Sequence, residues 1–352
     1  RVRQIERRLD DSVYFATLRS EEATTFEEVA PHDFRLKTNG GETLALTVEF
    51  TGEPRRDDGL TFADVRASSV GGWEDYWMKG AAVDFSGSKD PRAAELERRV
   101  VLSQYLVRVN YASNFPPSED GLTNITWFGK HHSEMYYWHA AHFYAWGRTE
   151  LLEKSLAWYR KILPFAQADA TAQGFEGARW PKMSGIDGRA SPGSINPFII
   201  WNQPNPIALC ELVYRSRPER ATLELYRDVV FESAEFLASF AHLDAAKDRY
   251  VLGPPIKNVS EKSGENTTQN PTFELAYWYY GLQVAQQWRE RLGLAPEPHW
   301  ADVLAKLSKL PERDGLYVEI ETFPDLFERE GPVPTSMLMV LGFMPKVDIV
   351  DT

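Results

Sequence analysis

Residues 127–146 contain the densest group of side chains that could bind or transform a ligand. This segment has eight aromatic residues in twenty positions and four of the seven histidines of the chain. Aromatic rings stack on sugar rings, while ammonium, imidazole and carboxylate groups can hydrogen-bond sugar hydroxyls. The segment therefore predicts a sugar pocket, in which Trp127 or Trp138 would stack on the ring. The hydroxyl-binding candidates are Lys130, His131, His132 and Glu134.

Two other interpretations of this segment stay open. His131, His132, His139 and His142 could bind a metal ion, but the H-E-x-x-H order is absent and no carboxylate partner is evident. The histidines could also be buried and hydrogen-bonded within an aromatic helix. We favour the sugar pocket and expect neither a metal nor another cofactor.

A second chemically rich segment, residues 174–191, is too glycine-rich for a helix yet carries several charges and a tryptophan. An arginine fork suits vicinal hydroxyls or a carboxylate. The alternative is a solvated loop with local salt bridges. Side-chain amides follow at 202, 203 and 205, where they could bind hydroxyls. The candidate ligand-binding residues here are Arg179, Trp180, Lys182, Asp187, Trp201 and Gln203.

The third segment, residues 250–278, is a loop that leads into a helix. Glu274 lies in the first turn of that helix, where a carboxylate is expected to cap the free amides. Glu261 lies in the middle of the loop. If an aromatic pocket encloses it, its pKa would rise, as a general acid requires.

The elements that must position these segments change type near residue 60. Residues 1–55 show the two-residue alternation of strands, with a turn at 39–41. Two or three strands do not form a domain alone, so they indicate the end of a β-sandwich. Beyond residue 60 the period is 3.6, which predicts helices after Pro91 and over 132–146, 149–168, 203–216, 218–241, 271–292, 298–309 and 335–342.

Long loops separate these helices at 112–130, 173–200, 251–270 and 311–334. Loops of this length in a compact helical domain usually carry function. Short turns that alternate with long loops indicate an α/α toroid with the long loops on one rim. We therefore predict a mainly α fold, an incomplete (α/α)6 barrel that lacks its last helices. The predicted parts are the sandwich tail (1–55), a helical linker (56–90) and the catalytic barrel (91–352).

Composition narrows the function classes. The formal net charge of −12 argues against a nucleic-acid partner, and no apolar run is long enough to span a membrane. Cys210 is the single cysteine, which excludes internal disulfides and cysteine-based metal clusters. Three glycosylation sequons, at Asn124, Asn258 and Asn266, favour a secreted glycoprotein, with a cytoplasmic protein as the alternative. Because the sequence starts with Arg1, we expect a processed chain or a piece of a longer one.

Taken together, the three segments resemble the six-hairpin glycosidases, and in particular glycoside hydrolase family 65. Gly177-Ala178-Arg179-Trp180-Pro181 is similar to that family's Gly-Ala-Arg-Tyr/Phe-Pro-Trp loop, which lines the −1 sugar site. Tyr137-Trp138-His139 resembles its Phe-Trp-Asp, with His139 in place of the aspartate. Gly253-Pro254 followed by Glu261 resembles its Gly-Pro-Asp-Glu, although the glutamate lies several residues later.

The resemblance implies an exo-acting hydrolase that cleaves an oligo- or polysaccharide with inversion. Glu261 would be the general acid, His139 would contact the −1 sugar, and the general base is unassigned. A polysaccharide lyase on a similar toroid, a sugar phosphorylase and a non-catalytic carbohydrate-binding protein are the alternatives. The remaining part of the same polypeptide, as another fragment, is a further expected partner.

Overall fold

The computed structural model describes residues 2–55, 59–122, 124 and 126–330. The chain divides into two compact units, Arg1–Gly80 and a second that begins at Ala81. The expected linker, 56–90, is thus divided between the two units. No described helix combines the length and apolarity that crossing a membrane requires.

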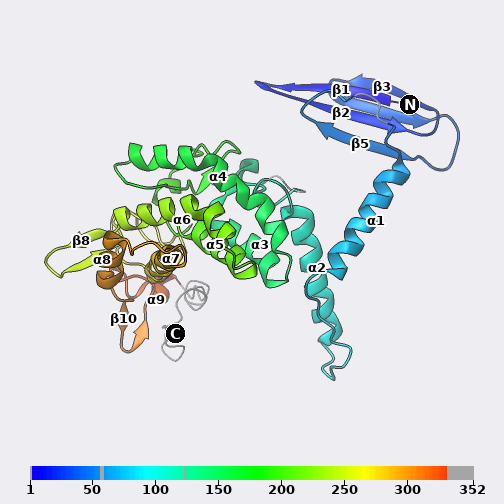
Figure 1. The fold of residues 1–352 in the computed structure, drawn as a ribbon. Helices are drawn as coiled ribbons and strands as arrows, with labels where there is room; N and C mark the ends of the chain where they lie inside the picture. Colours follow the sequence, from blue (N-terminus) through cyan, green and yellow to red (C-terminus); the bar gives the residue numbers. More distant parts are fainter. Residues whose placement is uncertain (1, 56–58, 123, 125, 331–352) are drawn as a thin grey trace. The chain divides into compact units, whose positions relative to one another are not determined.

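The first unit consists of antiparallel strands and one helix (Figure 1). The strands occupy the positions where the sequence alternates, and their sheet has the order β1-β2-β5 beside a separate β3–β4 hairpin. Helix α1 (Phe62–Met78) starts with a capping box between Thr61 and Asp64. The strands are β1 (Val2–Leu9), β2 (Ser12–Ser20), β3 (Thr24–Ala30), β4 (Asp33–Thr38) and β5 (Leu46–Thr51).

The second unit is built mainly from helices (Figure 1). Each helix that the 3.6-residue period predicts between 91 and 309 is present, within a few residues of its expected ends. The predicted helix at 335–342 lies outside the described residues. The helices are α2 (Ala93–Tyr111), α3 (Ser133–Ala145), α4 (Thr149–Ala172), α5 (Asn205–Ser216), α6 (Arg220–Phe240), α7 (Thr272–Arg291), α8 (Pro298–Lys306) and α9 (Leu326–Glu330).

Three helical hairpins, α3–α4, α5–α6 and α7–α8, form two layers. Helices α3, α5 and α7 pack beside one another in one layer, and α4, α6 and α8 pack beside one another in the other. Short connections make the two helices of each hairpin antiparallel. Buried aromatic side chains fill the space between the layers, among them Trp278, Trp288 and Trp300. This arrangement confirms the prediction of an incomplete (α/α) barrel.

Because α3, α5 and α7 run in the same direction, the long connections that lead into them meet at one end of the unit. The connections also contact one another in series. Strand β6 (His131–His132) pairs with β7 (Met183–Ser184). The Lys257 amide donates to the Phe198 carbonyl at 2.8 Å, and the Thr272 amide donates to the Glu319 carbonyl at 2.9 Å. The expected gathering of long loops on one rim is therefore present.

The sequons differ in their accessibility. Asn258 is fully buried, and its side-chain amide donates to Ser260 and Glu319. It is therefore no acceptor for a glycan in the folded protein. Asn124 and Asn266 are exposed.

Gly177 allows the connection at 173–200 to pack closely against α6. Its φ is +73°, and a Cβ at this position would overlap with the Glu232 carbonyl oxygen and the Phe236 backbone nitrogen. We expect Gly177→Ala to lower the free energy of unfolding by about 2–3 kcal/mol, because a methyl group here adds overlap to backbone strain. Urea denaturation would measure this loss.

Gly174→Ala is the matched control for this prediction. Gly174 has a similar φ of +84°, but no atom lies within 4 Å of a Cβ built there. We expect a loss of about 1 kcal/mol, from backbone strain alone. Equal losses in the two variants would contradict the close packing of Gly177 on α6.

Candidate functional site

A group of four ionisable side chains lies at the start of α3. We call Glu119, His132, Glu134 and Lys182 the rim cluster. The Lys182 Nζ lies 2.9 Å from Glu134 Oε1, and the His132 Nδ1 lies 3.0 Å from Glu119 Oε2 and 3.3 Å from Glu134 Oε1. Pairing of β6 with β7 explains the cluster, because it brings 182–184 alongside 131–133.

Glu119 connects the rim cluster to solvent. Its side chain is 18% exposed, against 5% for Glu134. Burial raises the pKa of Glu119 and the nearby Glu134 raises it further, whereas His132 and Lys182 lower it. Glu119 is therefore a carboxyl group with an elevated proton affinity near the surface. The sequence motifs did not single it out.

An exposed aromatic ring lies beside the cluster. The Trp127 side chain is 57% exposed, and its ring centroid lies 5.9 Å from that of His132 and 5.8 Å from Lys182 Nζ. Trp127 and Phe128 both have positive φ, at 46° and 62°. Consecutive non-glycine residues in this region are strained, and such strain often marks a functional site. An aromatic surface next to fixed polar groups is what a sugar-binding site requires.

The other candidates from the first segment lie away from this surface or partly within the protein. His131 is buried, its ring contacts Tyr136 and Trp158, and its Nδ1 lies 3.1 Å from the Pro117 carbonyl oxygen. Burial lowers the pKa of His131 to about 4, so it is a neutral structural histidine. Lys130 is half-buried.

Trp138 and His139 lie at least one turn further along α3 than Glu134. Trp138 is half-buried against a second apolar cluster that includes Trp201 and Phe273, and the His139 ring lies 4.3 Å from that of Tyr111. Burial lowers the pKa of His139. The histidines of the segment thus have separate partners. Among the described residues, no group of three or more His, Cys, Asp or Glu side chains is arranged to hold a metal ion.

Several candidates from the second segment belong to the core instead of an open site. Trp180 is 1% exposed, and its indole N–H donates to Ser233 Oγ of α6 at 2.9 Å. The Gln203 side chain accepts the Trp180 amide at 2.9 Å and donates to the Trp180 carbonyl at 2.8 Å. Trp201 is also buried and packs on Phe273. Since Trp180 and Gln203 hydrogen-bond within the protein and Trp201 is buried, we leave these three residues out of the sugar site.

The charged residues of the same segment have protein partners. Arg179 is buried and donates to the Gln173 side chain and the Pro197 carbonyl. Asp187 forms an exposed ion pair with Arg189, as the solvated-loop interpretation predicted. A cavity of about 80 Å³ lies beside Arg179 and Lys182. It is small compared with ligand sites, which enclose roughly 300 Å³ or more.

Glu261 lies on the rim but is exposed, so the condition of an enclosing aromatic pocket is not met. Its amide donates to the Asn258 carbonyl at 2.8 Å, which closes a tight turn, and its φ is +59°. This turn directs the side chain outward. Glu261 is therefore accessible to a ligand, but the described residues do not bury its side chain.

Glu274 does not form the expected helix cap. The residue at the N-cap of α7 is Pro271, which has no N–H for a returning carboxylate to accept. Glu274 is fully buried, and neither oxygen accepts a well-formed hydrogen bond from a described residue. Burial, with a smaller contribution from Glu319, raises the pKa of Glu274 to about 8, while its own amide and that of Val259 oppose the rise. The proline three positions earlier was a signal in the sequence against a cap.

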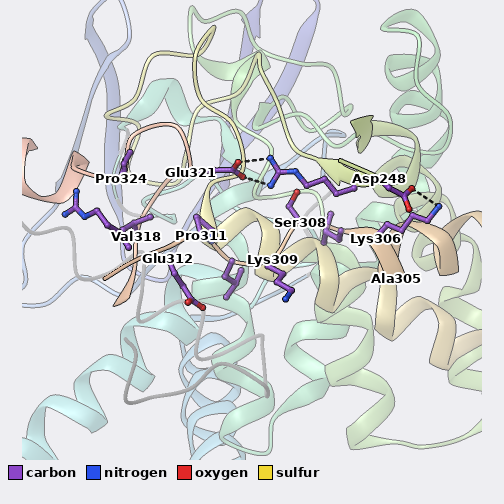
Figure 2. Close-up of a pocket in the computed structure, with 14 residues that line it drawn as sticks. Asp248, Ala305, Lys306, Ser308, Lys309, Pro311, Glu312, Val318, Glu321 and Pro324 are labelled. Carbon is purple, nitrogen blue, oxygen red and sulfur yellow. Dashed lines mark hydrogen bonds and ion pairs between the residues drawn. The ribbon is translucent and has the colours of Figure 1, made fainter. Parts of the chain in front are cut away.

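A larger cleft of about 660 Å³ lies beside the last rim connection, and Figure 2 shows its lining. Its charges mostly neutralise one another. The Arg249 guanidinium lies 2.7 Å from Glu321 and the Lys306 ammonium lies 3.3 Å from Asp248, as the dashed lines mark. None of the residues that the sequence predicted as a site lines this cleft.

Comparison with solved structures identifies the class of fold. A candidate kojibiose phosphorylase from the human microbiome matches with a TM-score of 0.66 at 11% identity, over 89% of this chain and 46% of that one. Two structures of a glycosidase, the wild type and a point variant of it, match with TM-scores of 0.50 and 0.51 at 17% identity, over 66% of this chain and 62% of theirs. No protein-family model and no curated protein matches the sequence.

The chain therefore has a six-hairpin glycosidase-like fold. The resemblance to glycoside hydrolase family 65, which the motifs indicated, is confirmed at the level of the fold. The chain spans less than two thirds of the length of each of these structures, and about half of the phosphorylase candidate.

Proposed function

We propose that this chain is part of an enzyme that acts on glycosidic bonds and hydrolyses them with inversion. The observation that carries the proposal is the exposed Trp127 ring beside the rim cluster, at the end of the barrel where the long connections meet. The fold that the chain shares with glycosidases and a phosphorylase candidate supports the same class of chemistry.

In this proposal the Trp127 ring stacks on a pyranose while Lys130, Glu119 and Lys182 hydrogen-bond its hydroxyls. Glu134 fixes Lys182 in place through its contact of 2.9 Å with Nζ. Glu261, the exposed rim carboxyl, protonates the leaving oxygen. An inverting hydrolase also needs a second carboxylate about 6.5–9.5 Å from the acid to activate water, and we do not assign that residue.

Phosphorolysis is the second candidate because one structural neighbour is described as a kojibiose phosphorylase. It requires cations that can hold a phosphate ion. Lys182 and Arg189, two cations of the segment 174–191, are paired with Glu134 and Asp187. Their charges are therefore largely compensated, which favours water over phosphate as the nucleophile.

Release of reducing sugar from a panel of oligo- and polysaccharides in phosphate-free buffer tests the proposal. We expect turnover without phosphate, and NMR of the first product should show the anomer opposite to that of the substrate. Phosphate-dependent release of a sugar 1-phosphate would indicate a phosphorylase, and absorbance from a C4–C5 double bond would indicate a lyase. Binding without turnover would contradict an enzymatic role.

Trp127→Ala should reduce kcat/KM on the substrate that this panel identifies by about tenfold. Loss of the apolar surface that the ring covers corresponds to about 1–2 kcal/mol. Phe165→Ala is the matched control, because Phe165 is 52% exposed on α4, in the layer formed by α4, α6 and α8. Thermal unfolding of both variants should match wild type, and an equal kinetic effect of both would contradict a stacking role.

A further inference from the structure

Two side chains hold the turn that carries Glu261. Lys257 Nζ donates to the Glu261 and Ser263 carbonyls at 3.3 and 2.8 Å, and the buried Asn258 makes the other contacts. Asn258 is 0% exposed. Its Nδ2 donates to Ser260 Oγ at 2.7 Å, and its Oδ1 accepts from Ser263 Oγ at 2.9 Å. Its carbonyl accepts the Glu261 amide at 2.8 Å. Asn258 therefore contacts the turn on both sides of Glu261.

Asn258 also joins the turn to the neighbouring rim connection. Its Nδ2 donates to Oε1 of Glu319, which is itself only 6% exposed. The backbone carbonyl of Glu319 accepts the Thr272 amide at 2.9 Å. One side-chain hydrogen bond thus links the Glu261 turn, the connection that carries Glu319, and the first residue of α7.

Glu274 lies beneath this link. It is fully buried, without the cap that its position in α7 predicts, and the Val259 amide and the Glu319 carboxylate are its polar neighbours. Lys257, a cation of the same loop, donates to the Ser263 carbonyl at 2.8 Å and lies 3.9 Å from Glu265. A fully buried carboxyl group therefore lies near the Asn258–Glu319 bond.

We propose that Asn258 and Glu319 are positioning residues that hold Glu261 at the site of proton donation. The proposal rests on the proposed function, in which Glu261 is the general acid. Glu261 has a left-handed backbone, which a glutamate keeps only where its surroundings enforce it. A misplacement of a catalytic group by about 1 Å costs on the order of 100-fold in rate. An exposed carboxyl group on a short turn therefore keeps the position that proton transfer needs only if the turn is anchored.

The test exchanges donor and acceptor across the link. Asn258→Asp removes the Nδ2 donor at nearly constant size and places a carboxylate against that of Glu319. Adding Glu319→Gln to this variant restores one donor and one acceptor in reversed order. Asn266→Asp, at an exposed position of the same loop, is the matched control for the added charge. Should Asn258→Asp not fold, Ser263→Ala removes a single contact of Asn258 and supplies the same comparison.

Two readouts separate positioning from general damage. In hydrogen–deuterium exchange, Asn258→Asp should raise the exchange rates of amides 257–265 at least tenfold, and the double variant should return them to within about threefold of wild type. On the natural glycan, kcat/KM of Asn258→Asp should fall about 10–100-fold. On the fluoride of the same sugar, whose leaving group needs little protonation, it should fall less than threefold.

The outcomes distinguish this inference from the proposed function. Absence of glycoside turnover by the wild-type protein would overturn the proposed function. With an active wild type, unchanged exchange in Asn258→Asp, or equal losses on glycan and fluoride, would overturn the positioning role alone. A double variant as impaired as Asn258→Asp would also overturn it, because its donor and acceptor are again matched.

Discussion

Glu261→Gln should lower kcat on the natural glycan by about 10²–10⁴-fold, because an amide cannot donate the proton that the leaving oxygen needs. The fluoride of the same sugar should lose far less. The side chain is exposed, so the free energy of unfolding should not change measurably. Steady-state kinetics on both substrates, together with urea denaturation, would check these expectations.

Glu265→Gln is the matched control for Glu261→Gln. Glu265 lies four residues later in the same loop, and its carboxylate is 3.9 Å from Lys257 Nζ. We expect it to keep nearly full activity. If Glu261→Gln instead retained most activity, the acid would have to lie elsewhere on the rim. Glu119 would then be tested first, since burial raises the pKa of its carboxyl group and its side chain reaches the surface.

We expect the wild-type protein to lose stability as the pH rises from about 5 to about 8. Glu274→Gln should remove a large part of this loss. Glu274 has a pKa raised to about 8, against an ordinary value of 4.5, so the folded protein keeps a proton that the unfolded chain releases. Its contribution is therefore fully present below about pH 4.5 and is lost as the pH rises towards 8. The size of this effect is on the order of 3–5 kcal/mol.

A neutral glutamine does not titrate, so the variant should match wild type near pH 4.5 and exceed its stability at pH 8–9. Urea denaturation across this pH range measures the difference. Glu290→Gln, at an exposed position of the same helix, is the control and should leave the pH dependence unchanged. A Glu274→Gln variant with the pH dependence of wild type would show that the buried carboxyl group is already ionised at neutral pH.

The helices illustrate what can be predicted locally. A period of 3.6 residues over more than ten positions depends only on neighbours in the sequence, which is why the ends of α3, α5 and α7 agree with the structure. The short and long connections likewise follow from the sequence, and so does the gathering of the long ones on one rim. The same reasoning placed Glu261 and Lys182 in these connections, and His132 and Glu134 at the start of the predicted helix 132–146.

Burial and pairing depended on residues far apart in the chain. Trp180 is a core residue because Ser233, 53 positions later, accepts its indole N–H. Glu119 became part of the site only when β6 and its neighbours brought His132 and Lys182 beside it.

The sequence by itself determined the helical periods, the long connections and the supply of aromatic and charged groups within them. The tertiary structure alone decided which of these groups face solvent, which are used in the core, and that Glu274 is a buried carboxyl group next to Glu319 instead of a helix cap. The physical reason is that hydrophobic periodicity arises from adjacent residues, whereas the environment of a side chain depends on every segment that packs against it.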